Sequence, residues 1–238
     1  MVLAVQNLRV QYGARVLFND LSFTVEDGER IALAGHNGAG KSTFARCLCG
    51  LDKRALGELE LNGHSYRAKQ RCHISYMVMQ DVNHQLFTED VLDELLLSMD
   101  GEDEKENTER ANQILSSLDL ADKIKLHPMS LSGGEKQRVA IGSAIASNKE
   151  ILVFDEPTSG LDYFHMVEVS DNLNRLKDMG KNLFLITHDP ELIYKCCTYL
   201  LFIQENKVLW HRPMDDEAIK LLRAFFSHEK GADITNAS

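Results

Sequence analysis

Eight residues near the N-terminus form the clearest chemical pattern in the sequence: Gly35-His36-Asn37-Gly38-Ala39-Gly40-Lys41-Ser42, with the spacing G-x-x-x-x-G-K-S. The glycines let the backbone turn so tightly that successive N–H groups can point at phosphate oxygens. Lys41 can reach the terminal phosphates of a nucleotide, and the hydroxyl of Ser42 can bind Mg²⁺. A strand pattern precedes the segment and a helical pattern follows it. The segment therefore predicts a nucleoside-triphosphate site rather than a plain turn.

A second pattern, Ile151-Leu152-Val153-Phe154-Asp155-Glu156, is an apolar strand that ends in two carboxylates. Two such charges at the end of a core strand are costly unless they meet a cation or a substrate. Given the phosphate-binding loop, we expect Asp155 to hold the magnesium ion through water. We expect Glu156 to polarise the attacking water, as a general base or by positioning it. Taken alone, the pattern also fits an ordinary strand end at the surface.

The third pattern is Leu131-Ser132-Gly133-Gly134-Glu135. Ser132 and Glu135 have the spacing of a capping box, which predicts a helix that begins here and continues to residue 146. The ordinary interpretation is a helix start and nothing more. The two glycines, however, leave a bare helix N-terminus that an anion can approach, so Ser132 and the N–H of Gly134 can also grip a γ-phosphate.

The rest of the sequence predicts the elements that position these residues. Residues 30–34 form an apolar strand that leads into the glycine-rich loop, and residues 42–50 form a helix after it. Between residues 81 and 147 apolar side chains recur at helical spacing, which indicates a helical insertion. Parallel strands joined through helices make an α/β sheet. We expect further strands at 17–25, 57–61, 74–79, 151–154 and 183–187, a helix at 163–179, a hairpin at 200–203 and 207–210, a short helix at 215–226, and disorder at 229–238.

Composition and charge restrict the class of protein. The 238 residues carry a formal net charge of −10, and residues 81–109 hold eleven acids against one lysine, so the remainder is balanced. This argues against nucleic acid as a partner, and the acidic segment fits either a basic partner or a solvated helix face. We find neither an apolar run of the roughly 18–20 residues that a membrane span needs nor a signal-peptide pattern. The five cysteines lack zinc-site spacing and are typical of a reducing compartment, so we expect a cytosolic protein.

These motifs resemble, over nearly all of residues 3–210 and in the same order, those of the nucleotide-binding subunits of ABC transporters. Gln80, the segment Ser159-Gly160-Leu161-Asp162 and His188 match further motifs of that family. The resemblance implies an α/β fold: a P-loop NTPase (RecA-like) core with an N-terminal antiparallel β subdomain and an inserted helical subdomain. The core would comprise residues 1–80 and 148–210, the helical signature subdomain 81–147, and a short C-terminal helix with a disordered tail 211–238.

The resemblance also implies an ATPase that binds ATP and Mg²⁺ between two subunits of a head-to-tail dimer. Each phosphate loop would face Ser132-Gly133-Gly134 of the other subunit, which belong to the signature motif of the family, residues 131–135. Tyr12 matches the aromatic residue that stacks on adenine in this family. The catalytic residues would be Glu156, His188, Gln80 and Lys41, and the Mg²⁺ ligands Ser42, Gln80 and Asp155. The nucleotide-binding residues would be Tyr12, Gly35, His36, Asn37, Gly38, Ala39, Gly40, Lys41, Ser42, Thr43, Ser132, Gly133, Gly134 and Asp162.

Within the family, residues 80–91 resemble ATPases of energy-coupling-factor importers, which take up vitamins or transition-metal ions. That resemblance implies a transmembrane coupling subunit and a substrate-binding membrane protein as partners, at the cytoplasmic face of the cell membrane. The acidic segment 81–109 would suit arginines of the coupling subunit. Two alternatives stay open: the ATPase subunit of another ABC transporter, and a soluble ABC-type ATPase in a non-transport assembly. A nucleoside kinase is excluded because it has no use for residues 131–135 or His188.

Overall fold

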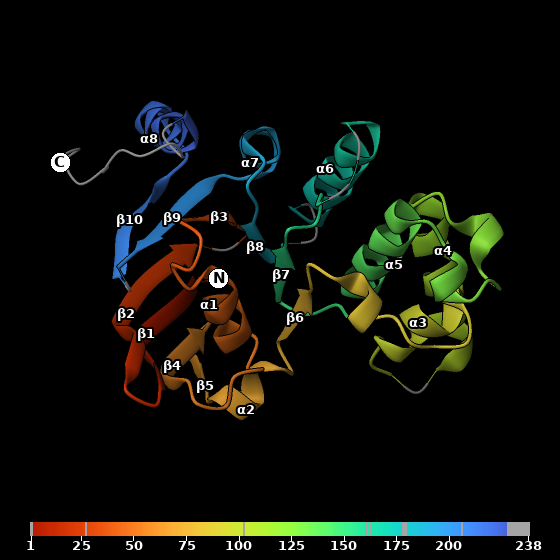
Figure 1. Ribbon diagram of the computed structural model, residues 1–238. Coiled ribbons are helices and arrows are strands. Elements are labelled where there is room, and N and C mark those ends of the chain that lie inside the picture. Colours follow the sequence, from red (N-terminus) through yellow and green to blue (C-terminus); the bar gives the residue numbers. More distant parts are fainter. Residues whose placement is uncertain are drawn as a thin grey trace.

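The computed structural model describes residues 2–26, 28–101, 103–159, 161, 163–177, 180–205 and 207–227. Its centre is a six-stranded sheet in the order β10-β9-β3-β8-β7-β6 (Figure 1). Five strands are parallel, and β10 pairs with β9 in the antiparallel direction. The strands are β3 (Arg30–Ala34), β6 (Ser75–Val78), β7 (Ile151–Asp155), β8 (Asn182–Ile186), β9 (Tyr199–Gln204) and β10 (Lys207–Pro213).

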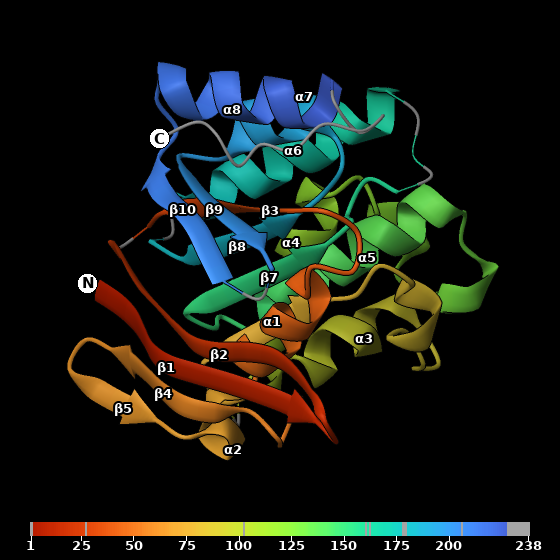
Figure 2. The ribbon, with the colours of Figure 1, turned by 60° about the vertical axis from the view of Figure 1, so that its left-hand side comes forward.

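A second, antiparallel sheet lies on one side of the central sheet, with helix α1 (Lys41–Leu48) between the two (Figure 2). Phe44 of α1 contacts Phe23 of the second sheet at a ring-centroid distance of 5.7 Å and Phe184 of the central sheet at 6.2 Å. Apolar side chains of both sheets therefore pack against the helix that follows the phosphate loop. The second sheet comprises β1 (Val2–Tyr12), β2 (Arg15–Glu26), β4 (Leu56–Leu61) and β5 (His64–Tyr66), and the short helix α2 (Ala68–Arg71) follows it.

The opposite face of the central sheet carries α6 (Tyr163–Lys177), α7 (Pro190–Cys196) and α8 (Asp216–Ser227) (Figure 2). Because successive strand residues point to opposite faces, each strand contributes to both cores. On β3, Ile31 and Leu33 pack into the core around α1, whereas Ala32 and Ala34 pack into the core of the helical layer. Both faces are covered, which explains the continuous apolar runs of β7 and β8.

The segment between β6 and β7 forms a helical subdomain beside the sheet edge (Figure 1). Its main helices are α3 (Val91–Leu97), α4 (Glu104–Ser117) and α5 (Gly133–Ala146), with 3₁₀ turns at Val82–His84, Ala121–Lys123 and Pro128–Ser130. The predicted fold class, including the antiparallel subdomain and the helical insertion, is confirmed. Helices α2 and α7 were not predicted. Strand β10 extends three residues beyond the predicted core boundary at 210, and the tail from residue 228 lies outside the described residues.

Candidate nucleotide-binding and catalytic site

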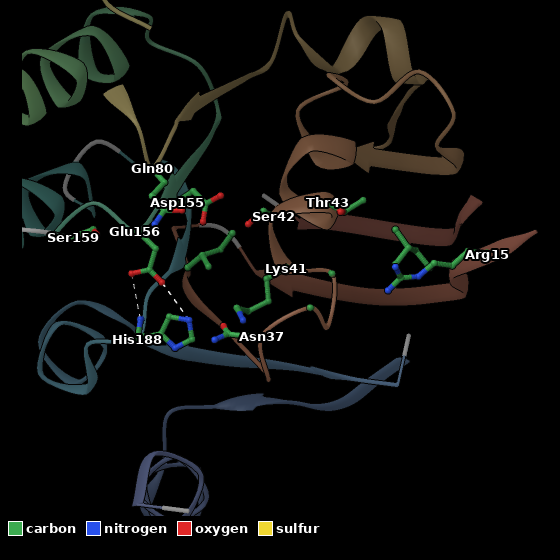
Figure 3. A pocket seen from close by; sticks show the side chains of 14 residues that line it. Arg15, Asn37, Lys41, Ser42, Thr43, Gln80, Asp155, Glu156, Ser159 and His188 are labelled. Carbon is green, nitrogen blue, oxygen red and sulfur yellow. Dashed lines mark hydrogen bonds and ion pairs between the residues drawn. The ribbon is translucent and has the colours of Figure 1, made fainter. Parts of the chain in front are cut away.

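The parallel strands bring the predicted motifs to one edge of the central sheet, because the loops after their carboxyl ends lie side by side. The phosphate loop follows β3, Gln80 follows β6, Glu156 follows β7 and His188 follows β8. These segments surround a cavity of about 660 Å³ (Figure 3). Its lining comprises Arg15, Leu17, Asn37, Gly38, Gly40, Lys41, Ser42, Thr43, Gln80, Asp155, Glu156, Ser159, Ile186 and His188.

The phosphate loop is closed by its own lysine. The Lys41 ammonium donates to the carbonyl oxygens of Gly35 at 2.8 Å and His36 at 3.2 Å, and the side chain reaches into the cavity (Figure 3). Gly40 has a φ of 100°, a left-handed conformation that suits glycine. It starts α1 without a capping side chain, so the first N–H groups of the helix face the cavity as anion donors. The loop therefore offers both N–H groups and an ammonium to phosphate oxygens.

Two carboxylates face the loop. Asp155 is buried, and this burial raises its pKa, against the opposing effects of the Ser42 hydroxyl and the Lys41 ammonium. Burial also raises the pKa of Glu156, whereas the nearby His188 lowers it. The Glu156 carboxylate lies 3.6 Å from Nε2 of His188 and accepts the His188 backbone N–H at 3.4 Å (Figure 3). Glu156 has a φ of 51°, a strained backbone for a residue with a long side chain, which is typical of functional sites.

The donor set here fits Mg²⁺. A magnesium ion prefers hard oxygen ligands and keeps several waters. Ser42, Gln80 and Asp155 line the same cavity and supply a hydroxyl, an amide and a carboxylate oxygen. Within the described ranges no group of three His, Cys, Asp or Glu side chains could hold a metal ion together. The buried charge of Asp155 is the group that a cation would stabilise.

The signature motif forms the predicted capping box. The Ser132 hydroxyl accepts the backbone N–H of Glu135 at 3.3 Å, and the Glu135 carboxylate accepts the N–H of Ser132 at 2.8 Å. Helix α5 begins at Gly133, and open space surrounds the position where a Cβ of this residue would lie. Residues 132–134 do not belong to the cavity lining given above. Within one chain, therefore, residues 132–134 and the phosphate loop do not line the same cavity, although both are predicted to bind phosphate.

Tyr12 also lies outside that cavity lining. Its hydroxyl donates to the carboxylate of Asp52, and the guanidinium of Arg54 lies 4.0 Å from its ring centroid. Arg54 in turn donates to both carboxylate oxygens of Asp52, at 3.0 and 3.1 Å. The ring is thus fixed by two residues that the sequence analysis did not connect with it. Across the β1–β2 hairpin Tyr12 pairs with Arg15, which does line the cavity.

The structure brings ten of the predicted site residues into one cavity: Asn37, Gly38, Gly40, Lys41, Ser42, Thr43, Gln80, Asp155, Glu156 and His188. Gly35, His36 and Ala39 belong to the same loop but not to the lining, and Asp162 lies outside the described residues. Arg15, Leu17 and Ile186 line the cavity and were missed, and Ser159, which the sequence analysis named only as part of a family motif, lines it too. Predicting the hairpin with its turn at residues 13–14 would have identified Arg15 as a neighbour of Tyr12, because paired residues of antiparallel strands share a face. Figure 3 shows Arg15 across the phosphate loop from His188.

Comparison with known proteins agrees with this geometry. The family model described as ABC transporter matches residues 18–159. A Treponema denticola protein described as an ABC transporter ATP-binding protein is 42% identical over 207 residues, which are 87% of this chain and 41% of that protein. The HMP/thiamine import ATP-binding protein YkoD of Bacillus subtilis is 32% identical over 86% of this chain and 38% of its own length. The chain thus spans about two fifths of these curated relatives.

The fold is also that of cbiO1 from Clostridium perfringens, described as part of the ABC transporter complex cbiONQ. The two superpose with a TM-score of 0.80 at 23% identity, covering 93% of each chain. In the described part of the chain no helix combines the length and the apolar character of a membrane span. The chain belongs to the ABC transporter family and is an ATP-binding cassette of that family, a P-loop ATPase module that uses ATP and Mg²⁺.

Proposed function

We propose that this chain is the ATP-hydrolysing subunit that powers an importer of the energy-coupling-factor type, for a vitamin or a transition-metal ion. The observation that carries the ATPase role is the cavity in which Lys41, Asp155, Glu156 and His188 converge. A phosphate-binding ammonium, a carboxylate for the metal ion and a second carboxylate beside a histidine are the groups that phosphoryl transfer to water requires.

In this proposal each group has a separate task. The N–H groups of the phosphate loop and Lys41 bind the phosphates, so that charge developing on them meets fixed positive dipoles. Ser42, Gln80 and Asp155 would hold Mg²⁺, which would neutralise phosphate charge when bound. Glu156 accepts a hydrogen bond from the attacking water and orients it towards the γ-phosphate. His188 holds the Glu156 carboxylate in place. It would also contact the γ-phosphate.

The complete site requires a second copy of an ATP-binding subunit, identical or homologous. Helix α5 begins at Gly133, where a Cβ would meet open space, and residues 132–134 do not line the cavity that holds the phosphate loop. In a head-to-tail dimer each of these termini would close the partner's site and add N–H donors to the γ-phosphate. Tyr12 would stack on adenine, and Asp162 would lie at the interface between the subunits.

The helical subdomain supplies the surface for the membrane subunits. Phe87 is 71% exposed and Leu97 is 60% exposed. In this proposal these two side chains contact the membrane subunits. Not all of the acidic charge of residues 81–109 is available to a partner at the surface. Glu94 is buried and accepts the N–H groups of residues 87 and 88. Asp90 pairs with Lys125 at 2.9 Å. We therefore place the coupling surface at the exposed Phe87 and at the exposed acids Glu89 and Asp93, which follow it closely in the sequence.

Two relatives support the importer type. YkoD is described as an HMP/thiamine import ATP-binding protein, and cbiO1 as part of an ABC transporter complex. By analogy we place the chain at the cytoplasmic face of the cell membrane. It would be held there by a transmembrane coupling subunit and a substrate-binding membrane protein.

The hydrolytic role is tested with Glu156→Gln. This variant is expected to bind Mg²⁺-ATP as tightly as the native chain, to accumulate as a dimer with ATP, and to hydrolyse ATP at least about 100-fold more slowly. Equilibrium binding, sedimentation and phosphate release give the three values. Turnover close to the native rate would refute the role of Glu156.

The importer role is tested by purifying a tagged chain from gently solubilised membranes and identifying its partners by mass spectrometry. A small coupling protein with several spans, together with a substrate-binding membrane protein, is the expected result. Phe87→Ser should lower their recovery, whereas Leu209→Ser, which removes an exposed apolar side chain from β10, should not. Recovery of two large permease subunits would indicate another type of ABC transporter. Recovery of soluble partners alone would refute a role in transport.

A further inference from the structure

Helix α8 places an aromatic side chain against the phosphate loop. Phe225 is only 2% exposed, and its ring lies 5.0 Å from the His36 imidazole at an interplanar angle of 66°. The same ring contacts Phe202 of β9 at 5.1 Å and 88°. Edge-to-face contacts of this kind hold the two rings at a defined separation and angle. The C-terminal helix therefore touches the loop at one side chain, although more than 170 residues separate them.

The backbone of His36 is the part of the loop that closes the turn. Its carbonyl oxygen accepts the N–H of Ala39 at 3.1 Å and the ammonium of Lys41 at 3.2 Å. A movement of His36 would change both hydrogen bonds and with them the position of the phosphate-binding lysine. The preceding residue, Gly35, packs directly against the backbone of β9. An added Cβ on Gly35 would lie only 2.2 Å from the carbonyl oxygen of Ile203 in that strand. Strand β9 and helix α8 thus support the first half of the loop together.

Helix α8 is itself held in a fixed position. Asp215 accepts the N–H of Ala218 at 2.8 Å and so caps the first turn. Arg212 donates to Asp215 at 3.0 Å and to Glu217 at 2.6 Å, which joins the end of β10 to the helix. The apolar face of α8 is buried on the helical layer (Figure 2). A ring on this helix can therefore restrain the loop instead of moving with it.

We propose that α8 is a positioning element of the nucleotide site: Phe225 holds the His36 side chain, and through it the phosphate loop, in the shape that binds the nucleotide. Neither Phe225 nor any other residue of α8 touches the reacting atoms in this proposal. Its effect is on the affinity of the loop for phosphates, and the rate of the chemical step at Glu156 is unaffected. The inference rests on the proposed role of the phosphate loop in binding ATP.

The test compares variants of the full chain by calorimetric binding of Mg²⁺-ATP and by steady-state hydrolysis. Phe225→Leu and His36→Ala each remove the ring contact and should raise the Kd about three- to tenfold. For Phe225→Leu, kcat should stay within twofold of the native value. The double variant should be no weaker than the weaker single variant, because both changes remove one interaction. His36→Phe keeps a ring at this position and should recover most of the affinity lost in His36→Ala. Lys220→Ala changes an exposed side chain of the same helix and serves as the control.

The outcomes separate this inference from the proposed function. If the native chain binds no ATP, the proposed function itself fails. If it binds ATP and the single variants match it, the positioning role of α8 is refuted. Losses that multiply in the double variant, or His36→Phe as weak as His36→Ala, would also refute it, because the imidazole would then act on its own. Thermal unfolding of each variant checks that the affinity is measured on folded protein, and His36→Ala, at an exposed position, keeps the test valid if Phe225→Leu fails to fold.

Discussion

Replacing Asp52 by Asn tests how the structure fixes the ring of Tyr12. The side chain of Asp52 is 2% exposed and accepts hydrogen bonds from the Tyr12 hydroxyl and from the backbone and guanidinium of Arg54. The pairing with Arg54, with a smaller contribution from Tyr12, holds the pKa of this carboxyl well below its usual range. Asn keeps the shape and one acceptor oxygen but loses the charge and the second acceptor.

The expected loss of stability follows from these contacts. A hydrogen bond that involves a charged group contributes about 1.5–3 kcal/mol, against about 1 kcal/mol for a neutral one. The Arg54 side chain is 60% exposed and regains water when its partner is lost, so the 3–5 kcal/mol of a fully buried broken pair does not apply. We therefore expect Asp52→Asn to lower the free energy of unfolding by about 2 kcal/mol at pH 7.5. For a chain of this length that corresponds to a decrease in Tm of about 4–8 °C.

The pH dependence gives the sharper test. A carboxyl whose pKa is lower in the folded than in the unfolded state stabilises the fold above its unfolded pKa, and this contribution is lost as the pH falls below it. The difference between native chain and variant should therefore shrink by about 1 kcal/mol between pH 7.5 and pH 3 in urea unfolding experiments. Asp171→Asn, the same change at an exposed position of α6, should stay within about 0.5 kcal/mol of the native chain. A loss at Asp52 that is independent of pH would refute the assigned charge interaction.

Three further changes probe other parts of the framework by urea unfolding. Arg71 is 1% exposed and donates to three backbone carbonyls, so Arg71→Met should cost about 3 kcal/mol. Gly50 has a φ of 71°, and a Cβ there would lie 2.2 Å from a carbonyl of α2, so Gly50→Ala should cost at least about 2 kcal/mol. The buried Glu94 accepts the N–H groups of residues 87–88, so Glu94→Gln should cost about 1–2 kcal/mol and speed hydrogen exchange at both amides. An unchanged unfolding free energy would contradict each assignment.

The sequence predicted the central sheet well because its strands carry their own signals. Strands β7 and β8 are buried on both faces and consist mainly of apolar residues, and polar residues of the site lie at the end of β7 and just after β8. The glycines of the phosphate loop predict its backbone conformation, because only glycine adopts the φ of 100° at position 40 without strain. The capping box at residue 132 is likewise a local device, and the structure contains both of its hydrogen bonds.

The contacts that the sequence did not reveal join distant segments. Asp52 and Arg54 lie in a loop after α1 and meet Tyr12 across 40 and 42 positions of the chain. No periodicity links such residues, because only the packing of the antiparallel sheet on α1 brings them together. The same holds for His36 and Phe225. Helices α2 and α7 were missed for a different reason: with four and seven residues they are too short to display a helical period.

The site combines several features that work against the stability of the nucleotide-free chain. Burial raises the pKa of both Asp155 and Glu156, so above that raised pKa each carboxylate holds a charge that the unfolded chain would hold at lower cost. The left-handed backbone at Glu156 adds roughly 1–2 kcal/mol of strain. A cation bound beside Asp155 would remove part of this cost and would thereby raise the free energy of unfolding of the chain. The apolar cores on both faces of the sheet hold these carboxylates in place without the ligand, and in the proposed mechanism they would meet the cation and the attacking water there.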